Sequence, residues 1–206
     1  MNTRILIGTE GKPFWNIPEM FSDIPWHASC ASKTTGIMLA SLILSFGAKT
    51  ILEIGIANGF TTACLLKALG VSAPREGLLV SCDINENCCL IAERLKKDVY
   101  HTVVRGNSSN ANWEKTFGKR KCDIIFIDGD HSYEACKEDI LRSTVVLREG
   151  GLVVLHDYAL GQSGVWKAVE DTMKPPEWGR LVIPENAFAC DIASVVCQKL
   201  PKWMRV

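Results

Sequence analysis

The sequence predicts an α/β protein with a doubly wound, Rossmann-like sheet that is mostly parallel and carries helices on both faces. Short, continuous apolar runs such as DIIFI (123–127) and LVVL (152–155) alternate with helical segments. Such runs are typical of parallel strands buried on both faces. Near the carboxyl end, two apolar runs follow each other with no helix between them. We therefore expect seven strands, the last two forming an antiparallel hairpin.

Each predicted element follows from hydrophobic periodicity and from the turn residues that bound it. The expected strands are 50–54, 78–82, 100–104, 123–127, 152–155, 181–183 and 192–197. The expected helices are 33–46, 60–69, 86–97, 110–117, 133–147 and 165–173. We expect the run 149–151 (EGG) and the pair 175–176 (PP) to end the last two helices, because glycine and proline terminate helices.

The size and composition of the chain fit one ordinary domain with a real core. Its 206 residues are 47% hydrophobic and 22% charged, a balance that excludes intrinsic disorder as the main state. Residues 1–32 are irregular and contain three prolines among aromatic residues. We expect them to form an arm that packs on a domain spanning 33–206 and that covers a site as a lid.

Charge and cysteine usage exclude several classes of protein. Lys+Arg equals Asp+Glu at 23 each, whereas proteins that bind nucleic acids through phosphates normally carry excess positive charge. No apolar run reaches the roughly 20 residues that cross a bilayer. The nine cysteines are scattered, with no C-x-x-C pair, which argues against a zinc ribbon or a disulfide framework. We expect a cytoplasmic protein with neither a nucleic acid nor a membrane as partner.

A glycine-spaced turn follows the first strand. The segment Glu53–Gly59 reads E-x-G-x-x-x-G and leads into a predicted helix. Gly55 and Gly59 allow positive φ or a close ligand, and the helix start offers unpaired N–H groups. A dinucleotide loop would have one more glycine, and Glu53 would repel a pyrophosphate. The pattern also fits a turn with no ligand.

Polar residues also follow the second and third strands. An acid at the end of the second strand, here Asp83, typically binds ribose hydroxyls. Asp83 or Asn85 can equally cap the next helix. Asn107 and Ser108 follow the third strand, where an amide can accept from an adenine amino group or can simply form a turn.

The fourth and fifth strands end in two acid–histidine groups. Asp128, Asp130 and His131 follow DIIFI, and His156 and Asp157 follow LVVL. If these strands are neighbours, the carboxylates and imidazoles converge, which is unfavourable unless a cation or bound protons offset the charge. We expect a divalent metal on Asp128 and Asp157 and a general base in His131. The alternative is that these residues only cap helices and form turns.

Two stretches of the chain resemble known enzymes. The turn at Glu53–Gly59 resembles motif I of the class I S-adenosylmethionine-dependent methyltransferases. The segments CDIIFIDGDHSYEACKEDI, LREGGLVVLHDY and GVWKAVED are similar to methyltransferase family 24, which includes macrolide-sugar O-methyltransferases and cephalosporin-hydroxylase-like proteins, and more distantly to catechol O-methyltransferase. The similarity runs from about residue 29 to residue 197.

The resemblance implies an O-methyltransferase that uses S-adenosylmethionine and acts on a hydroxyl of a small molecule. It places the methionine end of the cofactor on the first turn, the ribose on Asp83 and the adenine near the third strand. The implied cofactor residues are Glu53, Gly55, Ala57, Asn58, Gly59, Asp83, Ile84, Asn107, Ser108 and Asp128. The implied catalytic residues are His131 and Asp128.

The implied metal ligands are Asp128, His156 and Asp157. Relatives hold Mg²⁺ with an acid pair after the fifth strand, and here one acid of that pair is the imidazole of His156. Mg or Mn is expected from the resemblance, but imidazole suits Zn, Mn or Fe better than Mg. The presence and identity of the metal stay open at this point.

Other functions remain open from the sequence alone. They are an NAD-dependent oxidoreductase on a similar sheet, a nucleoside-binding module without chemistry, and a metal-dependent hydrolase. The last would leave the segment from Glu53 to Asp83 without a role. The acceptor and the oligomeric state, including a homodimer, are not readable from the residues.

Overall fold

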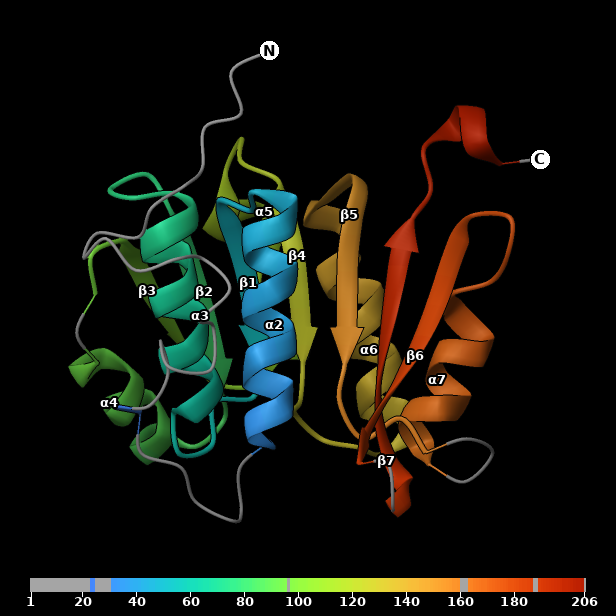
Figure 1. Cartoon of the computed structure of the whole chain (residues 1–206), viewed down its shortest axis with the longest axis horizontal. Helices are drawn as coiled ribbons and strands as arrows, with labels where there is room; N and C mark the ends of the chain where they lie inside the picture. Colours follow the sequence, from blue (N-terminus) through green and yellow to red (C-terminus); the bar gives the residue numbers. More distant parts are fainter. Residues whose placement is uncertain (1–22, 25–30, 96, 160–162, 187–188, 206) are drawn as a thin grey trace.

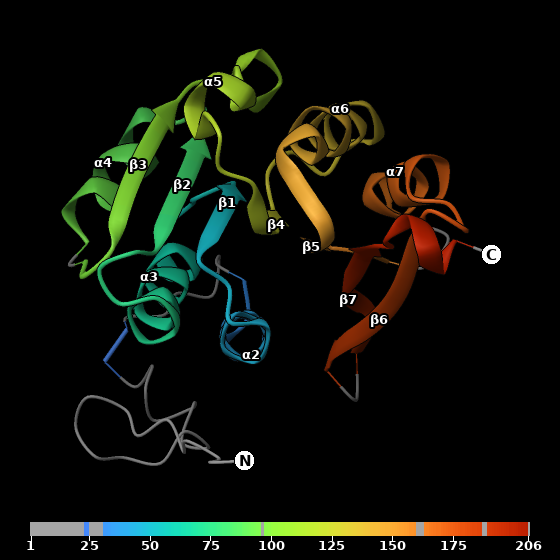
Figure 2. The ribbon, with the colours of Figure 1, turned by 90° about the horizontal axis from the view of Figure 1, so that it is seen from above.

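A seven-stranded sheet in the order β3-β2-β1-β4-β5-β7-β6 forms the centre of the computed structural model (Figures 1 and 2). The structure describes residues 23–24, 31–95, 97–159, 163–186 and 189–205. The strands are β1 Thr50–Ile54, β2 Leu78–Asp83, β3 Tyr100–Arg105, β4 Cys122–Ile127, β5 Leu147–Leu155, β6 Trp178–Asn186 and β7 Ala189–Lys199. The α-helices are α2 Lys33–Phe46, α3 Phe60–Ser72, α4 Glu86–Arg94, α5 Trp113–Phe117, α6 Tyr133–Ser143 and α7 Gly164–Thr172.

Strands β1 to β5 are parallel, and β7 runs antiparallel between β5 and β6. This confirms the predicted mostly parallel sheet that ends in a hairpin. Strands β4 and β5 are neighbours, with Ile127 beside Leu155. The residues that follow these two strands therefore emerge side by side at the carboxyl edge.

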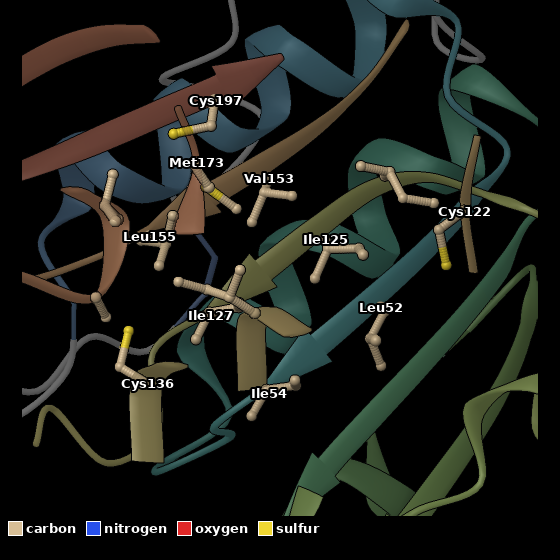
Figure 3. Close-up of a cluster of buried hydrophobic side chains, with 14 of the residues drawn as sticks. Leu52, Ile54, Cys122, Ile125, Ile127, Cys136, Val153, Leu155, Met173 and Cys197 are labelled. Atoms are coloured by element: carbon tan, nitrogen blue, oxygen red, sulfur yellow. The ribbon is translucent and has the colours of Figure 1, made fainter. Parts of the chain in front are cut away.

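Alternate strand residues feed two separate cores, one on each face of the sheet. Leu52 and Ile54 face α6 and α7 (Figure 3). Ile51 faces the other layer, where it packs with α2 and α3. Because both faces are covered, the central strands β1 and β4 are mostly apolar. Glu53 of β1 is a fully buried acid among these residues.

Several helices are shorter than the sequence predicts. The helix expected at 110–117 begins only at Trp113, because Asn112 accepts from Lys115 N and caps it. The helix expected at 86–97 ends at Arg94, and Leu95 is extended. The helix expected at 133–147 ends at Ser143 and is followed by a 3₁₀ turn.

The Glu149-Gly150-Gly151 run does not end a helix but lies within β5. Cys122 pairs with Leu147 and Ile124 pairs with Leu152, so the register shifts across this run. Gly150 has φ +73°, which suits a bulge. The prediction that this run ends a helix was therefore wrong, because the helix ends earlier, at Ser143.

The predicted arm, residues 1–32, lies mostly outside the described residues. Within it, Asp23 forms an ion pair with Lys67 of α3 and Ile24 packs against the α2–α3 core. Its role as a lid stays a prediction. None of the described helices has the length and hydropathy needed to cross a bilayer.

Candidate active site at the carboxyl edge of the sheet

The turn between β1 and α3 packs directly against the residues that follow β4. Gly55, Ala57 and Gly59 all have positive φ, at 94°, 48° and 76°. A Cβ on Gly55 would lie 2.1 Å from the backbone oxygen of Asp128. Only glycine permits the two backbones to come this close. The first turn and the residues that follow β4 therefore form one continuous surface.

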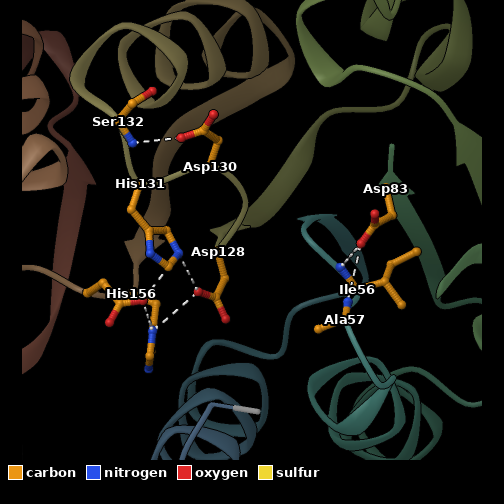
Figure 4. Close-up of polar contacts among 9 residues, drawn as sticks. Ile56, Ala57, Asp83, Asp128, Asp130, His131, Ser132 and His156 are labelled. Atoms are coloured by element: carbon orange, nitrogen blue, oxygen red, sulfur yellow. Dashed lines mark hydrogen bonds and ion pairs between the residues drawn. The ribbon is translucent and has the colours of Figure 1, made fainter. Parts of the chain in front are cut away.

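Asp83 holds the same turn from the adjacent strand. Its Oδ2 accepts from Ile56 N at 2.8 Å and from Ala57 N at 3.2 Å (Figure 4). Its Oδ1 accepts from Asn85 N at 2.7 Å, and Asn85 caps α4. The next residue, Ile84, is 74% exposed. An anchored acid beside an exposed apolar side chain suits a ribose joined to a planar base.

Glu53 lies beneath the turn, and its predicted contact with the cofactor stays a prediction. Its side chain is fully buried. It accepts from the hydroxyls of Thr61 and Thr62 on α3 at 2.9 Å and from that of Ser81 on β2 at 2.6 Å. Three donors around one buried carboxylate join β1, β2 and the start of α3. Glu53 thus positions the turn.

The buried carboxylate predicts a pH-dependent stability. Burial raises the pKa of Glu53 to about 7, so the folded state binds a proton that the unfolded chain releases near pH 4.5. The free energy of unfolding contributed by this group is therefore complete below pH 4.5 and is lost as the pH rises to 7. Urea unfolding of the wild type and of Glu53→Gln across this interval should give curves that converge or cross. Parallel curves would contradict the assignment.

Asn107 and Ser108 form hydrogen bonds in the turn after β3. The Asn107 side-chain oxygen already accepts from Ser109 N at 2.9 Å and caps a 3₁₀ turn at Ser108–Asn110. The Ser108 hydroxyl donates to Asp139 of α6. Both side chains thus have partners within the protein, and their contact with the adenine stays a prediction.

Asp139 is a residue of this region that the sequence reasoning missed. It is 4% exposed, and burial raises the pKa of its carboxyl to about 6. The helical periodicity of α6 is the signal that could have found it, because it places this acid at a core position. The buried residues of α6 are Cys136, Asp139, Ile140 and Ser143. Asp139 joins α6 to the turn after β3.

Two carboxylates and two imidazoles meet at the ends of β4 and β5. His131 Nε2 lies 3.4 Å from Asp128 Oδ1 and 3.2 Å from Asp157 Oδ2 (Figure 4). His156 Nδ1 lies 3.2 Å from the same Asp128 oxygen and 2.7 Å from the same Asp157 oxygen. The structure thus brings together all four residues predicted for metal binding and base catalysis.

The two histidines differ in accessibility. The His131 side chain is 48% exposed, whereas that of His156 is only 9% exposed. Hydrogen bonding to Asp128, aided by the charge of Asp157, raises the pKa of His131. Hydrogen bonding to His156 lowers the pKa of Asp157. His131 is therefore the imidazole that an incoming molecule can reach.

Three of these four side chains lie close enough together to share one metal ion. Asp128, His131 and Asp157 each offer one ligand atom within 4.8 Å of the others. Asp157 also has a left-handed backbone, with φ 54°, which is a strained conformation typical of functional sites. The mixed oxygen and nitrogen donors suit Mn, Fe or Zn.

Helix α7 supports the loop that carries His131. A Cβ on Gly164 would lie 2.4 Å from His131 O and 2.5 Å from Tyr133 N. The Tyr133 hydroxyl donates to Asp171 of α7 at 2.7 Å, and Lys167 lies 4.4 Å from its ring centroid. These contacts fix the start of α6 against α7.

We expect Gly164→Ala to displace the His131 loop. The added methyl group would overlap backbone atoms, which costs about 1–3 kcal/mol of stability. Without metal, NMR titration of the His131 ring should show its raised pKa falling toward the ordinary value. Gly179→Ala is the control, because its nearest atom would be Leu200 Cδ2 at 3.6 Å. An unshifted His131 titration in Gly164→Ala would disprove the positioning role.

The family of the chain follows from one comparison. The model of methyltransferase family 24, a methyltransferase domain, matches residues 52–158, just over half of the chain. The chain belongs to methyltransferase family 24. This confirms the prediction of a class I S-adenosylmethionine-dependent methyltransferase. No curated protein matches the sequence significantly.

Solved structures share the fold at low sequence identity. An O-methyltransferase from Bacillus cereus in complex with SAH has a TM-score of 0.69 and 18% identity, over 90% of this chain and 89% of that chain. The O-methyltransferase TomG from Streptomyces achromogenes, involved in tomaymycin synthesis and in complex with SAM, has a TM-score of 0.68 and 17% identity, over 91% and 89%. A putative caffeoyl-CoA O-methyltransferase from Staphylococcus aureus has a TM-score of 0.62 and 18% identity, over 92% and 94%.

The family match covers most of the site in this methyltransferase. Its interval includes the first turn, Asp83, the His131 loop and both residues after β5. Gly164 and the hairpin β6–β7 lie outside it. The matched interval therefore contains the acid–histidine cluster. Helix α7, which supports the His131 loop, comes after that interval.

Proposed function

We propose that this methyltransferase transfers the methyl group of S-adenosylmethionine to a hydroxyl of a small molecule, with help from a divalent metal. The observation that carries the proposal is the cluster at the ends of β4 and β5. Asp128 belongs to that cluster and also contacts the turn at Gly55 through its backbone. Donor and acceptor sites would then share one edge of the sheet.

The first turn has the features needed to hold the cofactor. Gly59 begins α3 without a side-chain cap, so the free N–H groups of the helix start suit the methionine carboxylate. Asp83 faces the position of the ribose, and the exposed Ile84 offers an apolar surface to the adenine. Bound S-adenosylmethionine would supply an electrophilic methyl group on a sulfonium.

The chain's own residues then orient the acceptor and remove its proton. Asp128 and Asp157 would hold the metal, which would supply positive charge that lowers the pKa of a nearby hydroxyl. His131 accepts that proton at Nε2, since it is the exposed imidazole. The bound cofactor would supply the methyl group to that oxygen and would leave as S-adenosylhomocysteine. Alignment of the two sites provides most of the rate.

Cofactor binding tests the first half of the proposal. Isothermal titration of the protein with S-adenosylhomocysteine should give a saturable isotherm, and Asp83→Ala should weaken it strongly. Asp98→Ala, an acid after α4 outside the candidate site, should leave binding unchanged. An undetectable isotherm in the wild type would refute the cofactor assignment.

Methyl transfer tests the second half. The protein with methyl-labelled S-adenosylmethionine should label small molecules in a metabolite extract, and a chelator should stop the labelling until Mn²⁺ or Mg²⁺ is added. Label in protein or RNA alone would overturn the small-molecule acceptor. Labelling that is indifferent to chelation would overturn the metal.

A further inference from the structure

A second candidate site lies at the opposite end of the sheet. A cavity of about 490 Å³ is lined by the amino ends of β1 and β3 and by the turns that precede β2 and β4. These ends form the upper edge of the sheet in Figure 1, whereas the candidate active site lies at the lower edge. Thr50 and Gly55 mark the two edges on β1, and they are about 17 Å apart at the usual rise of a strand.

The lining of this cavity is strongly basic in a chain whose net charge is zero. Lys49, Arg75, Arg120 and Lys121 line it, with Glu76 as the acid among the lining residues. The positive charge is therefore concentrated here by the fold, since the turns come from separate parts of the sequence.

The nearby carboxylates are already paired, and the arginines are not. Glu76 pairs with Lys49 at 3.1 Å, and Asp123 pairs with Arg148 at 2.6 Å. Within the part of the chain that the structure describes, neither Arg75 nor Arg120 forms an ion pair. Two unpaired guanidinium groups in one cavity suit the oxygens of a phosphate, which arginine binds in bidentate fashion.

The backbone conformation of Arg75 also indicates a binding site. Glu76 N bonds to Ala73 O at 3.1 Å, closing a turn with Pro74 and Arg75 at its centre. Arg75 has φ +63°, at the position where such a turn favours glycine. Ala57 and Asp157 are the other described non-glycine residues with positive φ, and both lie in the candidate active site. An arginine at a glycine position is strained, and that strain is typical of functional sites.

Tyr100 adds an aromatic surface at the rim. It opens β3, lines the cavity and is 62% exposed. An exposed ring beside unpaired arginines can stack on a base while the arginines hold the phosphates.

We propose that this cavity binds a small phosphorylated ligand that carries a planar ring, of the nucleoside diphosphate class. Arg75, Arg120 and Lys121 hold the phosphates, and Tyr100 stacks on the ring. The site is separate from the candidate active site and does not depend on the proposed function.

Titration with UDP and with pyrophosphate tests the proposal. The protein is first saturated with S-adenosylhomocysteine and treated with EDTA, so that neither the cofactor site nor the acid–histidine cluster binds the probe. Both probes should bind, and more weakly as salt rises. The double variant Arg75→Gln, Arg120→Gln should weaken both at least tenfold, while Tyr100→Ala should weaken UDP alone.

The control removes equal charge elsewhere. Lys174→Gln with Lys202→Gln lies outside the cavity and should change neither affinity by more than about twofold, since exposed charges are screened beyond about 10 Å. Failure of both probes to bind, or equal losses in the two double variants, would overturn the site. Binding of RNA without binding of UDP would replace the small ligand with a polymer. If Tyr100→Ala leaves UDP affinity unchanged, the proposed stacking of the ligand's ring on Tyr100 would be wrong.

Discussion

Gly55→Ala is expected to abolish cofactor binding and to destabilise the protein by about 3 kcal/mol or more, through a steric clash and an unfavourable backbone conformation. The new Cβ would lie 2.1 Å from Asp128 O and 2.9 Å from Gly129 N. Both belong to backbone that cannot move without shifting the His131 loop. Urea unfolding and titration with S-adenosylhomocysteine would measure the two effects, and we expect at least a 100-fold loss of affinity.

Gly47→Ala separates the clash from the cost of backbone conformation. Gly47 has φ +59° at the end of α2, and a Cβ there would meet nothing within 4 Å. This control should lose only about 1–2 kcal/mol, the cost of a left-handed residue with a side chain. Equal losses in the two variants would show that contact between the first turn and Asp128 is unimportant.

Asp128→Asn is expected to weaken Mn²⁺ binding by about 100-fold or more, since even changes to groups behind a metal ligand cost 10–100-fold. The amide removes the negative charge of the group whose Oδ1 contacts both His131 and His156. Methyl transfer to the acceptor found by labelling should fall by a comparable or larger factor. Electron paramagnetic resonance of free Mn²⁺ would report the binding.

Asp130→Asn is the matched control for that substitution. Asp130 lies two residues away, loses the same charge and accepts from Ser132 N at 2.8 Å, which an asparagine can also do. It should leave Mn²⁺ affinity within about threefold, because exposed charges are strongly screened. If Asp130→Asn were as damaging as Asp128→Asn, the loss would reflect general charge and not coordination.

The fold was predictable because its strands are apolar and its helices carry clear end signals. The helix at Lys33–Phe46 and the strand at Thr50–Ile54 have the predicted bounds. The convergence of Asp128, His131 and Asp157 followed from adjacent parallel strands alone. Errors arose where one residue pattern is compatible with two structures. The glycines at 150–151 form a bulge inside a strand instead of ending a helix.

The roles of individual polar groups were less predictable, since they depend on contacts distant in the sequence. Glu53 was assigned to the ligand because it precedes the first turn. Its three hydroxyl partners come from α3 and β2, and no spacing rule links them. Gly164 escaped notice for the same reason, because its close approach to His131 is a product of how α7 packs.

The bulge in β5 has a consequence for how this enzyme tolerates change. It lies ahead of the pairs that Ile124 to Ile127 make with Leu152 to Leu155. A residue inserted or deleted near Gly150 can be absorbed there, leaving the later rungs of the ladder, and the histidine and aspartate beyond them, in place. Natural length variation should therefore collect upstream of the bulge, whereas a one-residue slip after Leu152 would turn His156 away from its partners.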